Sequence, residues 1–488
     1  MAVFHRLGIS AWFDEAYSYG MSTQSWQSFF SRWVWGSESN MFLYYAILRG
    51  WLGLLKLVGV APTEVLLRLP SALFAIAATV VVFALGRRLF GRIAGLVASG
   101  LFLANSLQMT MAQTARAYSL GLLLMCLSWL ALFIALEKNT SRWWALYIAA
   151  GVLSVYALLF SGLVIVSQVL AVGALLLLPS PRQALVRTAG RRFVGSTVLI
   201  FLFVLPIGVD AAIHGGPVWV LPAQLSDLRL LIHVVAGGSH AYEYLVLATA
   251  GLAFVLTAAT YLPRLSKFTR GSPAIFTAAV ALGLWLAAPI AISFALTRPG
   301  LNLHLFYPRY LVVVVPPLCL LASLGVHALP LRALQALLAI ALALVAWTPL
   351  VDYYPVAQVQ DFKDPMIWMQ QRYQPGDGIA CDPDVECGIP MGYYLDAVRG
   401  PAHFDLDSPG RFSWDGSSTV SATPETLHAY IAHHRRIFLI YGPVSRNQVQ
   451  DGEDATLRAD LADAGYRLVD YFEARGYAVS TKVYLYQT

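Results

Sequence analysis

Long apolar windows constrain this chain more than any other feature of its sequence. A window of roughly 17–25 apolar residues can cross a bilayer as a helix, and several windows in one chain predict a polytopic bundle. Only 12% of the residues are charged, against about 25% in a soluble domain. A water-soluble globular enzyme and a disordered chain are therefore excluded. The predicted spans are 66–86, 93–108, 117–136, 143–159, 161–178, 194–213, 244–262, 274–294, 308–327 and 331–350.

The charge changes sign near Asp352. Residues 1–352 carry 22 Lys and Arg against 9 Asp and Glu, a net +13, whereas residues 353–488 carry 11 against 18, a net −7. We therefore expect a transmembrane domain over 1–352, with a first outer loop over 1–64, and a separate soluble domain over 353–488. The basic residues lie in short loops and form no continuous stripe, so no nucleic-acid partner is expected.

The soluble tail has the alternating pattern of a small α/β domain. Segments 436–442 and 483–488 read as strands, and segments 424–436 and 455–465 have helical periodicity, the second closing with Gly465. The predicted fold is therefore mainly α, a transmembrane helix bundle with a C-terminal α/β domain.

Basic residues in alternate loops predict the orientation of the bundle. By the positive-inside rule these loops face the cytoplasm, which places segments 1–64, 107–116, 214–243 and 295–307 and the tail outside. Of the nine acids before residue 353, only Glu137 would be cytoplasmic, which suggests chemistry on the outer face; the alternative is that acids merely tolerate that side. The cytoplasmic basic residues are Arg87, Arg88, Arg92, Lys138, Arg142, Arg182, Arg187, Arg191, Arg192, Arg264, Lys267, Arg270 and Arg332.

The cysteines give limited information on the compartment. Cys126 and Cys319 fall in apolar spans and read as small hydrophobic residues. Cys381 and Cys387 lie in the tail and could pair if the tail is outside the cytoplasm, although spacing alone does not establish a disulfide.

The first outer loop contains two adjacent carboxylates, Asp14 and Glu15, among aromatic residues. A carboxylate at the membrane surface can deprotonate an acceptor hydroxyl or hold a divalent cation against a phosphate. The alternative is that Asp14 caps a helix and Glu15 favours its dipole. No apolar span precedes Trp12, so we expect a first helix to be missing before it.

The next segment contains Glu38 and Asn40 and continues as an apolar helix to Gly59. Arg49 and Lys56 are seven residues apart on one helical face, which predicts an interfacial amphipathic helix with two cations near lipid phosphates. Ordinary snorkelling of the two side chains is the alternative.

Two further outer segments each place one arginine at the membrane boundary. Arg116 lies in QTARAY and Arg309 in YPRY. Arginine is the side chain best suited to bidentate phosphate contacts, although a lone arginine could equally snorkel. No closely spaced metal-ligand motif, nucleotide-binding loop or serine-hydrolase elbow occurs among these segments, which argues against an ATP-driven pump and a serine hydrolase. His214, His233, His240 and His304 lie in outer loops, and one of them could act as a base.

Taken in order, these segments resemble one known family. The quoted stretches are WFDEAYSYG, ESNMFLYYAILRGWLGLL, LLRLPSALFAIAATVVVFALGRRLFG, AQTARAYSL, YPRYLVVVVPP and DFKDPMIWMQQRYQPGD. They look like the bacterial members of the dolichyl-phosphate-mannose protein mannosyltransferase superfamily, the GT-C glycosyltransferases that include the aminoarabinose transferases.

The resemblance implies a glycosyltransferase that moves a sugar from a polyprenyl-phosphate donor to an acceptor hydroxyl, with inversion, on the outer face of the cytoplasmic membrane. The acceptor could be a lipid, a glycan or a protein, and membrane lipids are further partners. A transporter or flippase of a lipid-linked substrate is the competing hypothesis; it predicts charges at mid-membrane depth and paired half-repeats, and neither is found.

The same resemblance implies the site residues. Asp14 would be the main catalytic carboxylate, with Glu15 and Glu38 as further acids. Arg116 and Arg309 match positions expected near the donor phosphate. Beside the resemblance, we predict that Arg49, Lys56 and Tyr118 also bind the donor phosphate and that Asn40 and Tyr45 contact the acceptor or neighbouring groups. The metal requirement stays open, with Asp14 and Glu38 as the candidate ligands of a divalent cation. The sequence departs from the family pattern in two places. Many relatives have His/Lys-Pro-Pro before the tyrosine pair, where this chain has Asn40-Met41-Phe42. Some relatives have a second Asp in the next outer loop, and segment 105–110 of this chain has no acid.

Overall fold

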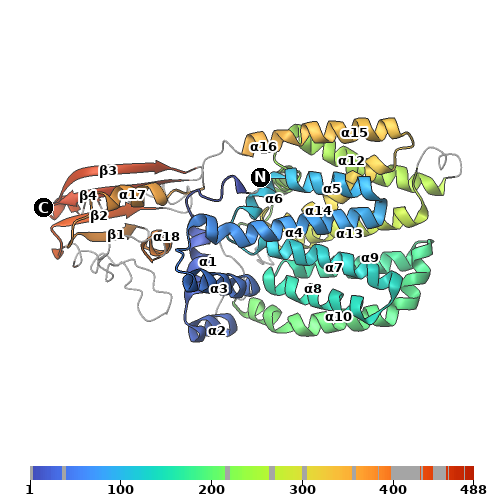
Figure 1. The fold of residues 1–488 in the computed structure, drawn as a ribbon, viewed down its shortest axis with the longest axis horizontal. Coiled ribbons are helices and arrows are strands. Elements are labelled where there is room, and N and C mark those ends of the chain that lie inside the picture. The colour runs from blue at the N-terminus through green and yellow to red at the C-terminus, as the bar shows by residue number, and fades with distance from the viewer. Residues whose placement is uncertain are drawn as a thin grey trace.

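The computed structural model shows a helical bundle joined to a smaller sheet domain (Figure 1). It describes residues 4–35, 40–214, 220–262, 270–298, 305–353, 359–382, 384–396, 429, 432–442, 458–459, 461–476 and 479–488. The helices are α1 Phe13–Thr23, α2 Trp26–Trp35, α3 Phe42–Leu57, α4 Glu64–Phe90, α5 Arg92–Ala104, α6 Ser106–Ala112, α7 Tyr118–Lys138, α8 Ser141–Ala157, α9 Ser161–Leu177, α10 Pro181–His214, α11 Leu225–Val235, α12 His240–Ala258, η2 Ala259–Tyr261, α13 Pro273–Leu296, η4 Tyr310–Val314, α14 Val315–His327, α15 Arg332–Val345, α16 Trp347–Tyr353, α17 Lys363–Gln370 and α18 Asp384–Asp396. The strands are β1 Gly378–Asp382, β2 Arg436–Tyr441, β3 Arg467–Arg475 and β4 Ser480–Gln487.

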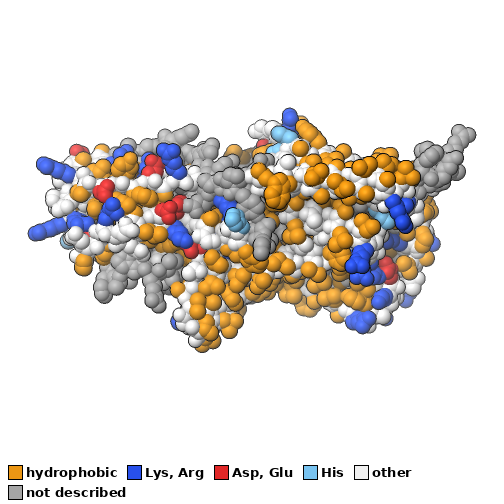
Figure 2. Space-filling model, turned by 45° about the horizontal axis from the view of Figure 1, so that its top comes forward, with side chains coloured by type: hydrophobic (Ala, Val, Ile, Leu, Met, Phe, Trp, Pro, Cys, Tyr) orange, Lys and Arg blue, Asp and Glu red, His pale blue; other side chains and the backbone are white. Residues whose placement is uncertain are grey.

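The bundle helices are long and apolar enough to make this a multi-pass membrane protein. Within the described residues, seven helices could each cross a membrane, or eight if the bent pair α5 and α6 forms one span. All ten predicted windows are helical, but the one over 93–108 is broken by a 70° bend at Asn105, and those over 143–159 and 161–178 are helices of only 17 residues. Figure 2 shows hydrophobic side chains over much of the visible face of the bundle, as expected of a lipid-facing surface.

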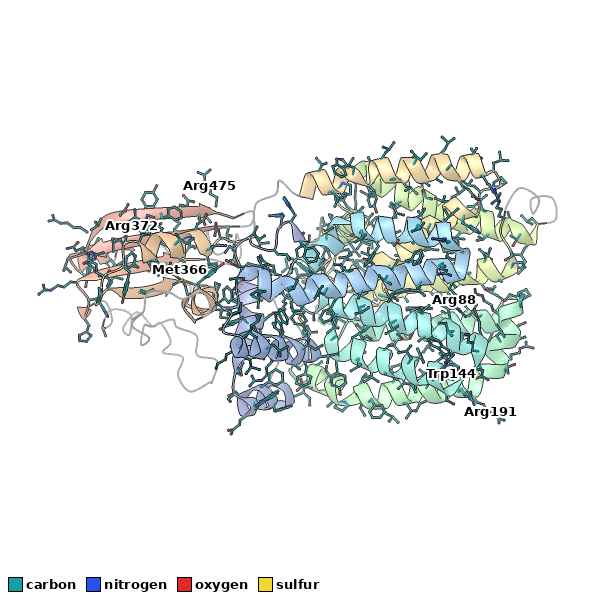
Figure 3. The ribbon with its side chains drawn as sticks, viewed as in Figure 1. Arg88, Trp144, Arg191, Met366, Arg372 and Arg475 are labelled. Atoms are coloured by element: carbon teal, nitrogen blue, oxygen red, sulfur yellow. The ribbon has the colours of Figure 1, made fainter. Side chains whose placement is uncertain are left out.

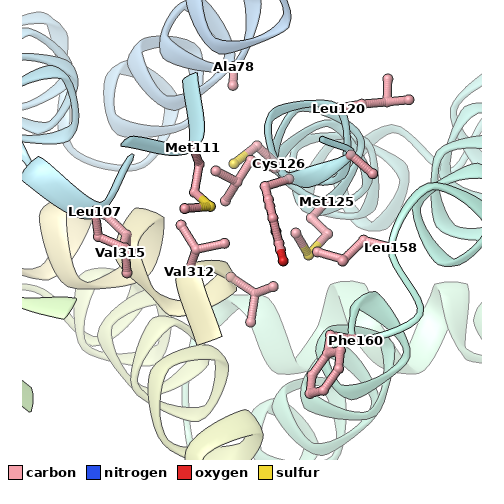
Figure 4. Close-up of a cluster of buried hydrophobic side chains, with 14 of the residues drawn as sticks. Ala78, Leu107, Met111, Leu120, Met125, Cys126, Leu158, Phe160, Val312 and Val315 are labelled. Carbon is pink, nitrogen blue, oxygen red and sulfur yellow. The ribbon is translucent and has the colours of Figure 1, made fainter. Parts of the chain in front are cut away.

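Small residues let the bundle helices approach one another closely. A Cβ on Gly325 of α14 would lie 2.0 Å from the backbone oxygen of Thr249 in α12, and one on Gly95 of α5 would lie 2.7 Å from that of Phe83 in α4. Membrane helices associate through such close contacts, because lipid removes the hydrophobic drive between them. Helices α6, α7 and α14 meet in a buried cluster that includes Met111, Cys126 and Val315 (Figure 4).

Basic side chains gather at the end of the bundle opposite the sheet domain. Arg88 and Arg191 lie there (Figure 3), and Arg88 forms an ion pair with Glu137, the acid predicted to face the cytoplasm. The arrangement agrees with the orientation expected from the loops, which remains a prediction.

Helices α1, α2 and α3 lie at the junction between the bundle and the sheet domain (Figure 1). Helix α3 carries Arg49 and Lys56 and exposes Leu54 and Leu57 near its end. This is the surface expected of an interfacial helix, so the first outer loop supplies the elements between the two domains.

The C-terminal domain is built on a four-stranded mixed sheet with the order β1-β2-β4-β3. Strand β1 is parallel to β2, whereas β4 is antiparallel to both β2 and β3. The strands predicted at 436–442 and 483–488 are confirmed as β2 and β4. Most of the helix predicted at 424–436 lies outside the described residues, and the described part of 455–465 is helical up to a turn at Gly465, which has φ +89°.

Candidate active site

Asp14 lies in the first turn of α1, where the helix dipole favours a carboxylate. Glu15 fixes this end of the helix, because one of its carboxylate oxygens accepts a hydrogen bond from the backbone N–H of Trp12 at 3.4 Å. The alternative in which Asp14 caps the helix is therefore wrong: Glu15 makes the capping contact, and the Asp14 side chain makes other contacts.

Two arginines from distant segments meet the Asp14 carboxylate. Arg309 Nη1 lies 2.8 Å from Asp14 Oδ2, and Arg116 Nε lies 4.0 Å from the same oxygen. The three side chains are 14–21% exposed, so their ion pairs are poorly screened by water. The fold therefore assembles one carboxylate and two guanidinium groups that the sequence separates by about 100 and 295 residues.

Aromatic rings surround the Arg309 guanidinium. Its Cζ lies 5.7 Å from the Trp12 ring, 5.2 Å from Tyr307 and 5.8 Å from Tyr310. Burial lowers the pKa of Arg309, but Asp14 and the neighbouring tyrosines raise it by more than burial lowers it. The net shift of this pKa is therefore upward, and the guanidinium stays charged. Aromatic faces hold a guanidinium in place without neutralising it, which keeps this cation available to an anion.

Two predicted tyrosines complete this group. Arg116 Nη1 donates a hydrogen bond to Tyr45 Oη at 3.2 Å. The buried Tyr118 interacts electrostatically with Arg309, Arg116 and Asp14. Tyr45 and Tyr118 therefore lie with the two arginines, as candidates for one site should.

Glu15 occupies a different environment from Asp14 although the two are adjacent. It is fully buried and pairs with Arg68 of α4, whose Nε lies 2.7 Å from Glu15 Oε1. The same oxygen accepts a hydrogen bond from the backbone N–H of Ala115 at 2.8 Å. Arg68 also donates to the backbone oxygens of Leu7, Ile9 and Ser10. The Glu15–Arg68 pair thus ties the segment before α1 to α4 and to the loop that carries Arg116.

The other two predicted cations, Arg49 and Lys56, lie on α3 and are not among the described ion-pair partners of Asp14. Arg49 donates to the backbone oxygens of Ser22 and Gln24 at the end of α1, and its Cζ lies 4.1 Å above the Trp26 ring. Lys56 is exposed near the end of α3. The contacts of Arg49 therefore hold the end of α1 and do not involve Asp14.

Asn40 supports the backbone at a second junction. Its Oδ1 accepts a hydrogen bond from the backbone N–H of Leu159, 3.2 Å away, between α8 and α9. The next residue, Met41, has φ +76° at the start of α3, and Asn40 helps to fix this turn against the bundle.

The residues described around Asp14 do not fit a divalent cation. Both nearby partners of Asp14 Oδ2 are arginines, whose positive charge would oppose a metal ion there. Glu38, the second predicted ligand, lies outside the described residues, as do the side chains of His214 and His304.

Sequence reasoning gave no role to Arg68, which lies in the quoted LLRLPSA stretch. An arginine inside an apolar segment is costly unless it is paired, and that signal could have identified it. The contacts of the tail with α1 were also missed. Gln360 Oε1 accepts from the backbone N–H of Phe13 at 3.1 Å, and Tyr394 Oη accepts from that of Ala11 at 2.8 Å.

Comparisons with known proteins agree with this architecture. The sequence model of the dolichyl-phosphate-mannose-protein mannosyltransferase family matches residues 46–208. The crystal structures of ArnT from Cupriavidus metallidurans, in the apo state and bound to undecaprenyl phosphate, match with TM-scores of 0.56 and 0.58 at 14% identity; each alignment covers 99% of this chain, and 95% and 96% of ArnT. The oligosaccharyltransferase of Archaeoglobus fulgidus, in complex with zinc and sulfate, matches with a TM-score of 0.53 at 13% identity, over 98% of this chain and 70% of that one. No curated protein sequence matches.

These findings agree with the resemblance drawn from the sequence over part of the chain. The family model matches residues 46–208, and the two ArnT structures share the fold over nearly the whole chain.

Proposed function

We propose that this multi-pass membrane protein is a glycosyltransferase that moves a sugar from a polyprenyl phosphate to an acceptor hydroxyl. The observation that carries the proposal is the group of Asp14, Arg116 and Arg309, one carboxylate held between two guanidinium groups. The family model and the ArnT structure bound to undecaprenyl phosphate support a lipid-phosphate donor.

Each member of the group has a distinct part in the proposed reaction. The donor phosphate binds Arg309 and Arg116 and so takes the place of Asp14 on Arg309, which frees a carboxylate oxygen. The acceptor oxygen attacks the anomeric carbon, its proton passes to Asp14, and the bond from that carbon to the phosphate oxygen breaks with its electron pair. The arginines stabilise the charge that develops on the leaving phosphate. A single displacement of this kind inverts the anomeric centre.

The remaining predicted residues take supporting parts in this proposal. Glu15 positions the loop through Arg68, Tyr45 and Tyr118 orient the arginines, and Arg49 holds the end of α1 while Lys56 faces the lipid headgroups. Glu38 stays a candidate acid of the first loop. We place the reaction on the outer face of the cytoplasmic membrane, together with the C-terminal domain. The disulfide-bonded state of Cys387 supports an oxidising compartment; the side chain of Cys381, its predicted partner, lies outside the described residues.

A transfer assay tests the proposal. Purified protein in lipid is given radiolabelled polyprenyl-phosphate sugars and a membrane extract as acceptor, beside Asp14→Asn. We expect label to move to an acceptor, and the variant to lose transfer while it stays folded, because Asn cannot accept the proton. The configuration of the product is read by NMR, and retention would rule out a single displacement.

The control is Asp227→Asn, a change of another outer carboxylate, which lies in the first turn of α11. Full transfer by Asp14→Asn would overturn the assignment of the base. Movement of intact donor across the bilayer without any transfer would favour the transporter hypothesis instead.

A further inference from the structure

A second group of polar side chains lies where α11 is followed by α12. His233 is near the end of α11, and His240 and Glu243 are in the first turn of α12. His233 Nδ1 lies 2.6 Å from Glu243 Oε2, and His240 Nδ1 lies 3.3 Å from the same oxygen. The imidazole centroids are 4.5 Å apart. One candidate ligand atom from each of the three residues therefore lies within 4.8 Å of the others.

We propose that His233, His240 and Glu243 bind one divalent transition-metal ion of the zinc class. Imidazole nitrogen and carboxylate oxygen are the donors that such ions take from proteins, at about 2.0–2.2 Å. Ligand atoms around a tetrahedral ion at that distance stand about 3.3 Å apart, so only small side-chain movements are needed. His240 is 72% exposed, which leaves the fourth position to water or to an external ligand.

The backbone between the ligands is held in the required shape. Gly237 and Gly238 have φ +102° and +74°, a conformation that glycine adopts without strain, and they turn the chain between the two histidines. Asn105 Nδ2 donates to the backbone oxygen of Val235, and Ser106 Oγ donates to that of Gly237, each at 2.8 Å. The loop is thus fixed from outside before any ion binds, which reduces the entropy cost of binding.

The position of this group links it to the candidate active site. Helix α11 packs against α6 and against η4. Segment 113–116, which ends at Arg116, follows α6, and Arg309 directly precedes η4. A metal ion that joins α11 to α12 would therefore stabilise the elements that carry the two arginines, although binding itself does not depend on the proposed transferase activity.

Metal binding by the untagged full chain tests the proposal. The protein is stripped with a chelator in detergent, and Zn²⁺ is titrated and counted by mass spectrometry. We expect one tightly bound ion per chain, and a loss of affinity of more than about tenfold in His233→Ala, His240→Ala and Glu243→Gln. Gln keeps the shape and one hydrogen bond of Glu243 but not its charge, so it separates loss of metal from loss of fold. The control is His433→Ala, an exposed histidine of the C-terminal domain.

Cobalt serves as the second probe because its absorption reports its ligands. We expect a visible spectrum of nitrogen and oxygen ligands without a thiolate band, since the free Cys126 and Cys319 are buried. Equal binding by the wild type and the three variants, equal loss in the control, or a thiolate band would each overturn the proposal.

Discussion

Asp14 and Glu15 are adjacent carboxylates with the same chemistry but different surroundings. Glu15 is buried against Arg68, whereas Asp14 is 14% exposed and faces two arginines that could turn to a substrate. Removing one partner of a buried ion pair leaves the other charge uncompensated, at a cost of about 3–5 kcal/mol. We therefore expect Glu15→Gln to lower the free energy of unfolding far more than Asp14→Asn. Thermal unfolding of both variants in detergent checks this, and equal stability would contradict the structural role of Glu15.

Arg309 offers a graded test at the same scale. We expect Arg309→Ala to lower kcat/KM by about 10²–10³-fold, the effect of losing one preorganised donor to a developing anion. Arg309→Lys keeps the charge but loses the fork of donors, so its activity should fall between that of Ala and the wild type. The assay is the same sugar transfer, with retention on size exclusion as the check on folding. Equal losses in the two variants would mean that geometry matters and charge does not.

Residue roles were only partly predictable from the sequence. The pattern predicted Asp14, Arg116 and Arg309 as separate candidates, but their meeting depends on contacts across as many as 295 residues, which no local periodicity encodes. Glu15 and Arg68 show the same limit, because an acid on a predicted outer loop gives no indication that it will be fully buried.

At the scale of elements, hydrophobic length predicted where helices form but not how they bend or pack. The window over 93–108 breaks because Asn105 caps α6, accepting a hydrogen bond from the backbone N–H of Gln108 at 3.1 Å, and also donates to α11. The mean hydropathy of a window does not show a single polar residue that changes the direction of the chain. Strands β1 and β3 were not predicted from the sequence. For β3 the reason is that it is an edge strand whose residues do not alternate regularly between buried and exposed.

The contact between α12 and α14 provides the test at this scale. We expect Gly325→Ala to destabilise the bundle by about 1–3 kcal/mol, the usual effect of overpacking, because the new Cβ would lie 2.0 Å from the backbone oxygen of Thr249. The measurement is thermal stability in detergent. The matched control is Gly251→Ala in α12, where a Cβ has open space; loss of stability there but not at Gly325 would show that the contact is misassigned.

At the scale of the whole molecule, the C-terminal domain holds the segment that carries the candidate base. Tyr394 of α18 accepts a hydrogen bond from the backbone N–H of Ala11 and donates to Glu64 Oε1 at 3.2 Å. Burial, and then Glu64, raise the pKa of Tyr394, so its hydroxyl keeps the proton that this second bond needs. The composition break near Asp352 predicted a separate soluble part, but not that this part would help to place the first outer loop.

This coupling predicts that a change in the C-terminal domain will affect the start of α1. Tyr394→Phe removes the hydroxyl alone, so we expect faster amide hydrogen exchange over residues 9–16 and reduced sugar transfer, with the sheet itself unchanged. Tyr471→Phe on the exposed face of β3 is the matched control and should leave both measurements as in the wild type. Protection of residues 9–16 that survives Tyr394→Phe would mean that the other contacts of this segment, such as those of Arg68 and Gln360, hold it without Tyr394. Loss of protection would mean that the bundle and the sheet domain position Asp14 together, from opposite sides of α1.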